Sequence, residues 1–493
     1  MQEHSETQEL YHEIFGSVLD RTDLTPYLLR NCYDYKSSLE RATLMMGNRG
    51  FQVVNGVLGP GEIERASGYV SQAIDFMTRW LFPMVEDQMK LLLELPSLSI
   101  EQENRYRNAV ESIHTLQTLL VGSPLASLVG EDPRHLFLLV SAKKYPHLFD
   151  GHPSVTQVPS RWRFAACAVL KMCHLIKSIE EDSQDIYDYA CLGMFFETHA
   201  ISLSGLYQFP WTEPTIFPTN ENARRAFVKV ASFFRKLYAS ISVNEDGGLV
   251  FNSGDGVQVD LVEVKARLKS PESMFAKLGK DASGEVYNLR DILAVTFLLK
   301  RRDDSLTLFH ALQKQGVILQ ENTVSTSITQ TLYDTPEDMA NAIRVLMCNL
   351  ARREGYEANP SDEEVLENAT SFLNALTANE RNNPHSSGLH RKFQCKINYS
   401  VPVPLRRDTY RVLMPLEEAS QEELITRQHT LPVELRISDI HSWQVSELSG
   451  DAHHDAYKCR QLLVLLNRLF TPLFNFPKDA ITALRADQNR LFK

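Results

Sequence analysis

The spacing of apolar residues changes along this chain, and the change predicts two kinds of structure. Up to about Ala239, apolar residues recur at helical intervals, as in segments 63–95, 161–179 and 223–241. Pro83 interrupts the first of these segments, because proline lacks the N–H group that a helix interior needs. We therefore expect an all-helical domain over residues 1–242.

After Ser240, short alternating runs replace the helical spacing. Segment 243–261 alternates β-prone runs with glycine turns, which is typical of a hairpin. Strands are then predicted near 291–299, 392–401, 409–414 and 433–437, and helices near 271–278, 305–315, 336–353, 362–376 and 456–470. This mixture lacks strict βαβ repetition, so it predicts an α+β domain over residues 243–493, with a sheet covered on one face and inserted helices at about 336–376.

The amino-acid composition is that of a globular protein. The chain has 493 residues, of which 43% are hydrophobic and 23% charged, as in ordinary globular proteins. Its polar start and the absence of a long apolar run predict a soluble, cytoplasmic protein that does not enter a membrane. The formal net charge of −11 argues against a DNA partner, and the seven scattered cysteines indicate reduced thiols.

Basic residues gather around a predicted helix start. Ser270 is a good N-cap and Pro271 suits the first helical position, so a helix is predicted to begin there. Helix N-termini carry unpaired N–H groups and a partial positive charge, which favour phosphate. The segment is a candidate polyphosphate site, and an amphipathic helix with solvated lysines is the alternative. Its basic and hydroxyl residues are Lys265, Arg267, Lys269, Ser273 and Lys277.

This segment, RLKSPES followed by AKL, resembles the ATP-binding pattern of the RelA/SpoT alarmone synthetases. In that family an arginine, a lysine, a serine and a second lysine bind the ATP phosphates. The resemblance places these roles on Arg267, Lys269, Ser273 and Lys277.

Two later segments extend the resemblance over the C-terminal half. DILAVTFLL is similar to the family strand whose first aspartate binds magnesium, which places a metal ligand at Asp291. LPVELRISD is similar to the family's VEIQIRT strand, which places a second carboxylate at Glu434, and alternation along VELRI puts Glu434 and Arg436 on the same face of that strand. One or two carboxylates with phosphate oxygens are a usual ligand set for Mg²⁺.

What the resemblance implies is a RelA/SpoT-like nucleotidyltransferase-type fold and a Mg²⁺-dependent pyrophosphokinase. Such an enzyme transfers pyrophosphate from ATP to a ribose hydroxyl of a nucleotide or of a tRNA end. Asp291 and Glu434 are then the catalytic residues, and Glu434 is also the candidate base. The expected partners are ATP and the acceptor, and homo-oligomerisation is left open.

The acceptor side departs from the family pattern. The segment NPHSSGLHRKFQ is similar to K-x-x-G-Y-R-S-x-H, but Leu389 stands at the position of the guanine-stacking tyrosine and Phe393 at that of the histidine. Thr296 replaces the arginine of the aspartate strand. The candidate acceptor-binding residues are Gly388, His390, Arg391 and Lys392.

These departures leave two further hypotheses open. The first is a catalytically inactive domain of this fold that binds a nucleotide or a protein partner. The second is an unrelated α-helical interaction protein in which the motif matches are accidental.

Overall fold

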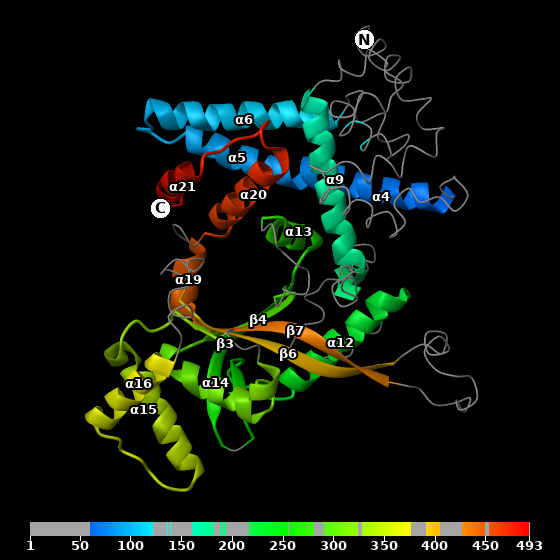
Figure 1. Ribbon diagram of the computed structural model, residues 1–493. Helices are drawn as coiled ribbons and strands as arrows, with labels where there is room; N and C mark the ends of the chain where they lie inside the picture. Colours follow the sequence, from blue (N-terminus) through cyan, green and yellow to red (C-terminus); the bar gives the residue numbers. More distant parts are fainter. Residues whose placement is uncertain are drawn as a thin grey trace, which may run out of the picture. The chain divides into compact units, whose positions relative to one another are not determined.

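The chain divides into two compact units, each discontinuous in sequence. The helical unit comprises Met1–Asp182, Glu272–Val286 and His454–Lys493, and the sheet unit comprises Ser183–Pro271 and Tyr287–His453. The computed structural model describes residues 60–121, 136, 139, 160–181, 188–189, 191–193, 216–254, 256–280, 289, 291–323, 328–375, 391–404, 426–448 and 453–492 (Figure 1). The observed division therefore differs from the expected boundary after residue 242.

Amphipathic helices build the helical unit. Their bounds are α4 (Pro60–Phe76), α5 (Phe82–Leu93), α6 (Ile100–Leu120), α9 (Ser160–Glu181), α13 (Pro271–Gly279), α20 (His454–Phe470) and α21 (Lys478–Leu491). In α6, Ile113, Leu116 and Leu120 recur at helical spacing and are buried. Within the described residues no helix is both long and apolar enough to cross a membrane.

The expected break at Pro83 takes the form of a π-helical turn. This turn, η3 (Met77–Leu81), joins α4 to α5, and the backbone N–H of Phe82 donates to the carbonyl of Met77. Pro83 then falls at the start of α5, where a missing N–H group costs little. The chain thus remains helical across the proline.

The C-terminal helices complete a core that the N-terminal helices begin. Ala276 of α13 and Leu463 of α20 are buried in the same cluster as Met77 and Leu116. The hydroxyl of Tyr106 also donates to Asp487 Oδ2 at 2.6 Å, which ties α6 to α21. Capping residues predicted α13 and helical spacing predicted α20, but neither signal shows which core a helix serves.

The strands of the sheet unit form one sheet, with seven strands among the described residues, in the order β1-β2-β3-β4-β7-β6-β5. The pairing of β4 with β7 is parallel, and all others are antiparallel. The predicted strand at 409–414 lies outside the described residues. The bounds are β1 (Ile241–Val243), β2 (Leu249–Asn252), β3 (Gln258–Leu268), β4 (Leu293–Leu299), β5 (Thr329–Gln330), β6 (Phe393–Pro404) and β7 (Thr426–Asp439).

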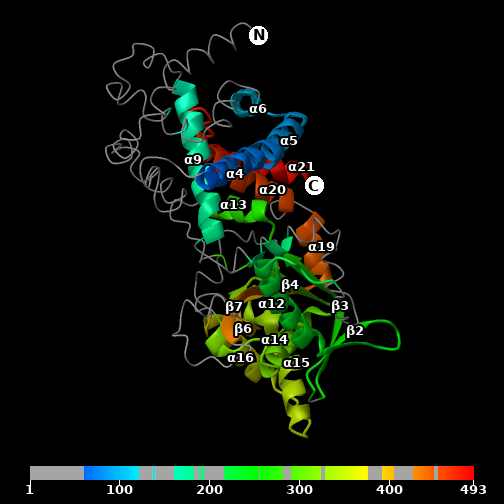
Figure 2. The ribbon, with the colours of Figure 1, turned by 90° about the vertical axis from the view of Figure 1, so that its right-hand side faces the viewer.

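Helices cover one face of this sheet, and the mixed α and β architecture agrees with the predicted α+β class. Figures 1 and 2 show α14, α15 and α16 together on one side of the central strands. The helix α19 follows β7 directly and was not predicted. The bounds are α12 (Glu221–Tyr238), η7 (Arg302–Asp304), α14 (Ser305–Lys314), η8 (Gln320–Asn322), α15 (Pro336–Arg353), α16 (Asp362–Ala375) and α19 (Ile440–Leu448).

Aromatic contacts identify the covered face. The ring of Phe393 on β6 lies 4.6 Å from that of Phe309 on α14, measured between centroids. On the same strand, Tyr399 lies 5.3 Å from Phe233 of α12. Side chains alternate along a strand, so Cys395 and Ile397, both buried, share this apolar face. The residues between them point to the opposite face.

Candidate functional site: the polar face of the sheet

Polar side chains form adjacent rows across the opposite face of the sheet. In one row Arg267 of β3 is paired with Ala294 of β4, which is paired with Glu434 of β7, and Glu434 with Lys396 of β6. The next row contains Lys265, Thr296, Arg436 and Gln394 in the same strand order. Together with Lys269, Asp291 and Lys392, these rows are called the polar face below.

Asp291 lies at the mouth of β4 and is held by Lys269. The Lys269 Nζ atom donates to Asp291 Oδ2 at 2.6 Å, and both residues are buried. The Lys269 backbone N–H also donates to the carbonyl of Ile292 at 2.7 Å, which fixes the two segments side by side. Two residues predicted to bind ATP phosphate and metal are therefore in direct contact.

Glu434 is the other carboxylate of this face and is only 3% exposed. Its Oε2 atom accepts from Arg436 Nη2 at 2.5 Å and lies 3.9 Å from Arg267 Nη2. Burial raises the pKa of this carboxyl, but the charges of Arg436, Lys392 and Lys396 outweigh burial and lower the pKa to about 2. The nearby negative charge of Asp291 acts in the opposite direction, so the two carboxylates influence each other.

Lys392 contributes an unusual amine to the polar face. Removal from water lowers its pKa to about 7, and the positive charges of Arg436, Lys396 and Arg267 act in the same direction. The charge of Glu434 opposes them. A bound anion near this amine would offset the neighbouring positive charges and so favour the protonated form of Lys392.

Cations outnumber carboxylates on this face, although the whole chain has a net charge of −11. Lys265 adds a further contact, since its Nζ atom lies 5.3 Å from the ring centroid of Trp443 on α19. The excess charge makes the face suited to a polyanion such as phosphate. The cations are Lys265, Arg267, Lys269, Lys392, Lys396 and Arg436, against the carboxylates of Asp291, Glu434 and Glu263, the last of which lies 3.5 Å from Lys265 Nζ.

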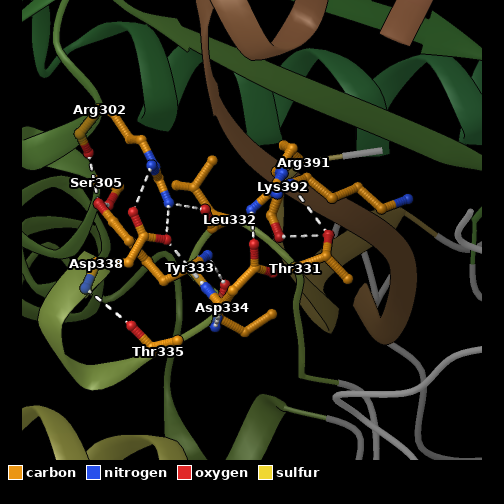
Figure 3. Close-up of polar contacts among 11 residues, drawn as sticks. Arg302, Ser305, Thr331, Leu332, Tyr333, Asp334, Thr335, Asp338, Arg391 and Lys392 are labelled. Carbon is orange, nitrogen blue, oxygen red and sulfur yellow. Dashed lines mark hydrogen bonds and ion pairs between the residues drawn. The ribbon is translucent and has the colours of Figure 1, made fainter. Parts of the chain in front are cut away.

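The predicted acceptor-binding residues separate in space. Arg391 Nη1 lies 2.6 Å from Asp334 Oδ2, which draws its guanidinium toward the loop before α15 (Figure 3). Thr331 exchanges hydrogen bonds with the backbone of Lys392, while the Lys392 side chain extends away from that loop. Gly388 and His390 lie outside the described residues.

A second network in Figure 3 fixes this loop. Arg302 donates to Asp338 through both terminal nitrogens, at 2.9 Å from Nη1 and 2.5 Å from Nη2, and it also donates to the carbonyl of Leu332. The Tyr333 hydroxyl donates to the carbonyl of Arg302 at 2.7 Å. These contacts anchor the loop that holds Arg391 and the start of β6.

Two residues that depart from the family pattern lie on different faces. Thr296 lies on the polar face between Lys265 and Arg436. Phe393 lies on the apolar face and is 2% exposed, so it does not occupy a position from which it would contact a ligand on the polar face. Leu389 lies outside the described residues.

Ser273 and Lys277 belong to the helical unit, whereas Arg267 and Lys269 belong to the sheet unit. The helix α13 does begin at Pro271, as its sequence predicts. Within the helical unit, Lys458 Nζ donates to Ser273 Oγ at 2.8 Å. The phosphate-binding roles expected of Ser273 and Lys277 stay predictions.

Sequence reasoning missed Gln394 and Lys396, and it noted Arg436 only as a neighbour of Glu434. The signal for the first two was present, because alternation along the predicted strand 392–401 places Lys392, Gln394 and Lys396 on one face. What the sequence does not show is that this face lies beside Glu434. That neighbourhood depends on the pairing of β6 with β7.

The polar face has the hard oxygen ligands that Mg²⁺ prefers, but few of them. Among the described residues, no group of three or more His, Cys, Asp or Glu side chains gathers to hold a metal. Asp291 and Glu434 would therefore bind Mg²⁺ only together with phosphate oxygens of a ligand, as is common for this ion. The residues fit a metal that arrives with a nucleotide.

Comparison with known proteins identifies no relative: no protein-family model matches the chain, and no curated protein or solved structure gives a significant match.

Proposed function

We propose that the polar face of the sheet unit binds the phosphates of ATP and that the protein transfers pyrophosphate from ATP to a ribose hydroxyl. The observation that carries the proposal is the gathering of cations around two buried carboxylates on one sheet face. The similarity of RLKSPES, DILAVTFLL and LPVELRISD to the RelA/SpoT synthetases supports it. The first segment begins with the last two residues of β3, and the other two contain most of β4 and β7; these three strands are neighbours in the sheet.

In this proposal the cations bind the donor. Arg267 is about half exposed and lies beside Glu434, so its guanidinium can donate to phosphate oxygens without leaving the site. The Lys269 ammonium, which donates to Asp291 in the ligand-free protein, also donates to a phosphate oxygen when ATP is bound. Charge-assisted hydrogen bonds of this kind are shorter and stronger than neutral ones, and they orient the triphosphate.

The carboxylates then serve the reaction. When bound, Mg²⁺ supplies charge neutralisation at the phosphates, and Asp291 and Glu434 would hold it. The ribose oxygen forms a bond to the β-phosphorus, the bond from that phosphorus to the α–β bridging oxygen breaks, and AMP leaves. The hydroxyl proton passes to Glu434.

Glu434 is a weak base in the ligand-free protein, because neighbouring cations lower its pKa to about 2. A bound polyanion pairs with Arg436 and Lys392 and so reduces their effect on the carboxyl. The pKa of Glu434 then rises toward the range in which a carboxylate accepts protons effectively.

A second candidate is a nucleotide-binding domain without catalysis. It is favoured by the cation partners that both carboxylates already have, and by the burial of Phe393 on the apolar face. In that case the polar face binds the nucleotide through the same cations, and no pyrophosphate is transferred.

Radiolabelled ATP distinguishes these candidates. The full chain is incubated with γ-labelled ATP, Mg²⁺ and GDP, GTP, adenine nucleotides or bulk tRNA, and labelled acceptor is separated by chromatography. We expect one acceptor to gain label, and Asp291→Ala and Glu434→Ala to abolish it. Glu367→Ala, an exposed position of α16, is the matched control.

ATP binding is measured in parallel by calorimetry, and the thermal unfolding midpoint of each variant shows whether it folds. Binding without labelled product would favour the second candidate. If the wild-type chain neither binds Mg-ATP nor labels any acceptor, both candidates are wrong.

A further inference from the structure

Two buried polar atoms of the polar face have no hydrogen-bond partner in the described part of the chain. They are Gln394 Oε1 and Arg436 Nε. Gln394 is only 6% exposed, so water does not readily supply the missing partner. A buried acceptor without a partner has lost its hydrogen bond to water with nothing in exchange, which makes such an atom a candidate ligand contact.

The two residues are neighbours in the sheet, and their unpaired atoms have opposite hydrogen-bonding character. Gln394 and Arg436 are directly paired across β6 and β7, and both side chains point to the polar face. Gln394 Oε1 only accepts, and Arg436 Nε only donates. A single group that satisfies both must donate and accept, which a hydroxyl does. An ionised phosphate has no donor and would leave Gln394 Oε1 unpaired.

The neighbouring row of the polar face can bind a second hydroxyl of the same ligand. Glu434 and Lys396 lie two residues farther along the same two strands, on the same face. That separation is about 7 Å between backbones, short enough for the side chains to converge on adjacent ligand atoms. A ligand with two neighbouring hydroxyls can thus place one at Glu434 and the other between Gln394 and Arg436.

We propose that Gln394 and Arg436 bind the ribose hydroxyl next to the one that reacts, so that this site takes ribonucleotide acceptors and discriminates against their deoxy counterparts. The inference rests on the proposed function, in which Glu434 receives the reacting hydroxyl. It names the group by which the acceptor is recognised, and it assigns a binding role to Gln394. Loss of that hydroxyl leaves both buried atoms unpaired, which weakens binding roughly 10- to 100-fold.

Calorimetry on the full chain tests this without turnover. The protein is saturated with Mg²⁺ and a non-hydrolysable ATP analogue. It is then titrated with the four common ribonucleoside diphosphates and with their 2′-deoxy and 3′-deoxy forms. At least one ribonucleotide is expected to bind roughly tenfold or more tightly than both of its deoxy forms. If none does, including the case in which none binds, the inference is wrong.

The variant Gln394→Met keeps the length of the side chain and removes the acceptor atom. It is expected to lose the preference over the deoxy form that lacks the hydroxyl next to the reacting one: ribonucleotide affinity falls to that of this form, whose own affinity is unchanged. Gln313→Met, on the exposed side of α14, is the matched control. Equal weakening of both kinds of nucleotide in Gln394→Met would assign Gln394 a structural role and overturn the inference.

The two proposals fail in different ways. Pyrophosphate transfer that uses ribo- and deoxyribonucleotides equally well would remove the role of Gln394 and keep the proposed function. Absence of Mg-ATP binding would remove the proposed function itself.

Discussion

The two faces of the central sheet differ in the side chains that they bury: apolar groups on one face and charged groups on the other. On the face covered by α12 and α14, β6 contributes Phe393, Cys395 and Ile397, all buried among apolar groups. On the other face, the residues between them are Gln394 and Lys396, which lie beside Arg436 and Glu434. One strand therefore serves both a core and a charged surface.

The stability of the fold accounts for the residues of one face but not for those of the other. Burial of apolar side chains is favourable in itself, so the apolar face needs no further reason. Burial of charge is costly unless partners compensate, and replacing buried ion pairs with apolar groups often raises stability. Lys269, Asp291 and Glu434 are nevertheless buried on this face, which is consistent with the proposed ligand site.

The largest effect is expected when a buried side chain of the apolar face is truncated. Phe393→Ala removes a ring that is 2% exposed and that contacts Phe309, so the free energy of unfolding should fall by about 3–5 kcal/mol. Urea unfolding monitored by circular dichroism measures the change. A loss below about 1 kcal/mol would show that this face does not form the core of the unit.

A substitution on the polar face should lower stability less than Phe393→Ala does, but it should weaken ligand binding. Asp291→Asn leaves the buried Lys269 ammonium without its carboxylate, so we expect a loss of about 1.5–3 kcal/mol in the free energy of unfolding. The rise in unfolding midpoint caused by Mg-ATP should also disappear. An unchanged response to Mg-ATP would separate Asp291 from the ligand site.

The polar face should also make stability depend on pH. The pKa of Lys392 is lowered from 10.5 to about 7 by loss of water and by Arg436, Lys396 and Arg267. Between these values the unfolded chain binds more protons than the folded one, so stability rises with pH, by at most about 1.4 kcal/mol per unit. The measurement is the free energy of unfolding at pH 7 and pH 8. Lys392→Met should flatten the difference.

Glu434 makes stability rise with pH in the same direction, but in the acidic range. Its pKa is lowered from 4.5 to about 2, so its ionisation stabilises the fold above pH 4.5. That contribution is lost as the pH falls toward 2. A Glu434→Gln variant should show a weaker dependence of stability on pH in this range.

The smallest effect is expected away from both faces. Thr335 caps α15, since its hydroxyl accepts from the N–H of Asp338 at 3.2 Å. Thr335→Ala should lower the free energy of unfolding by about 1 kcal/mol and leave Mg-ATP binding unchanged. A loss of ligand affinity here would show that the loop before α15 takes part in the site.

Local sequence determined most of the elements of this protein. Helical spacing predicted α14, α15, α16 and α20, and an N-cap serine followed by Pro271 predicted the start of α13. Alternation in VELRI placed Glu434 and Arg436 on one side of a strand. These features depend on neighbours within a few residues, which a single sequence displays directly.

The helix α19 escaped prediction because its start depends on a buried strand end. Its segment, IHSWQVSEL, has no marked apolar periodicity. Asp439, the last residue of β7, accepts from the N–H of Ser442 at 2.9 Å and satisfies the first turn. The helix is thus set by where β7 ends.

Only the tertiary structure decided which segments share a core and which charges share a face. It assigned α13, α20 and α21 to the helical unit, and it placed Gln394 and Lys396 beside Arg436 and Glu434 through the pairing of β6 with β7. Periodicity shows that a helix or strand has an apolar side but not what covers it. Partners far apart in sequence are selected by the packing and hydrogen bonding of the whole fold, so the polar face exists only once the sheet has formed.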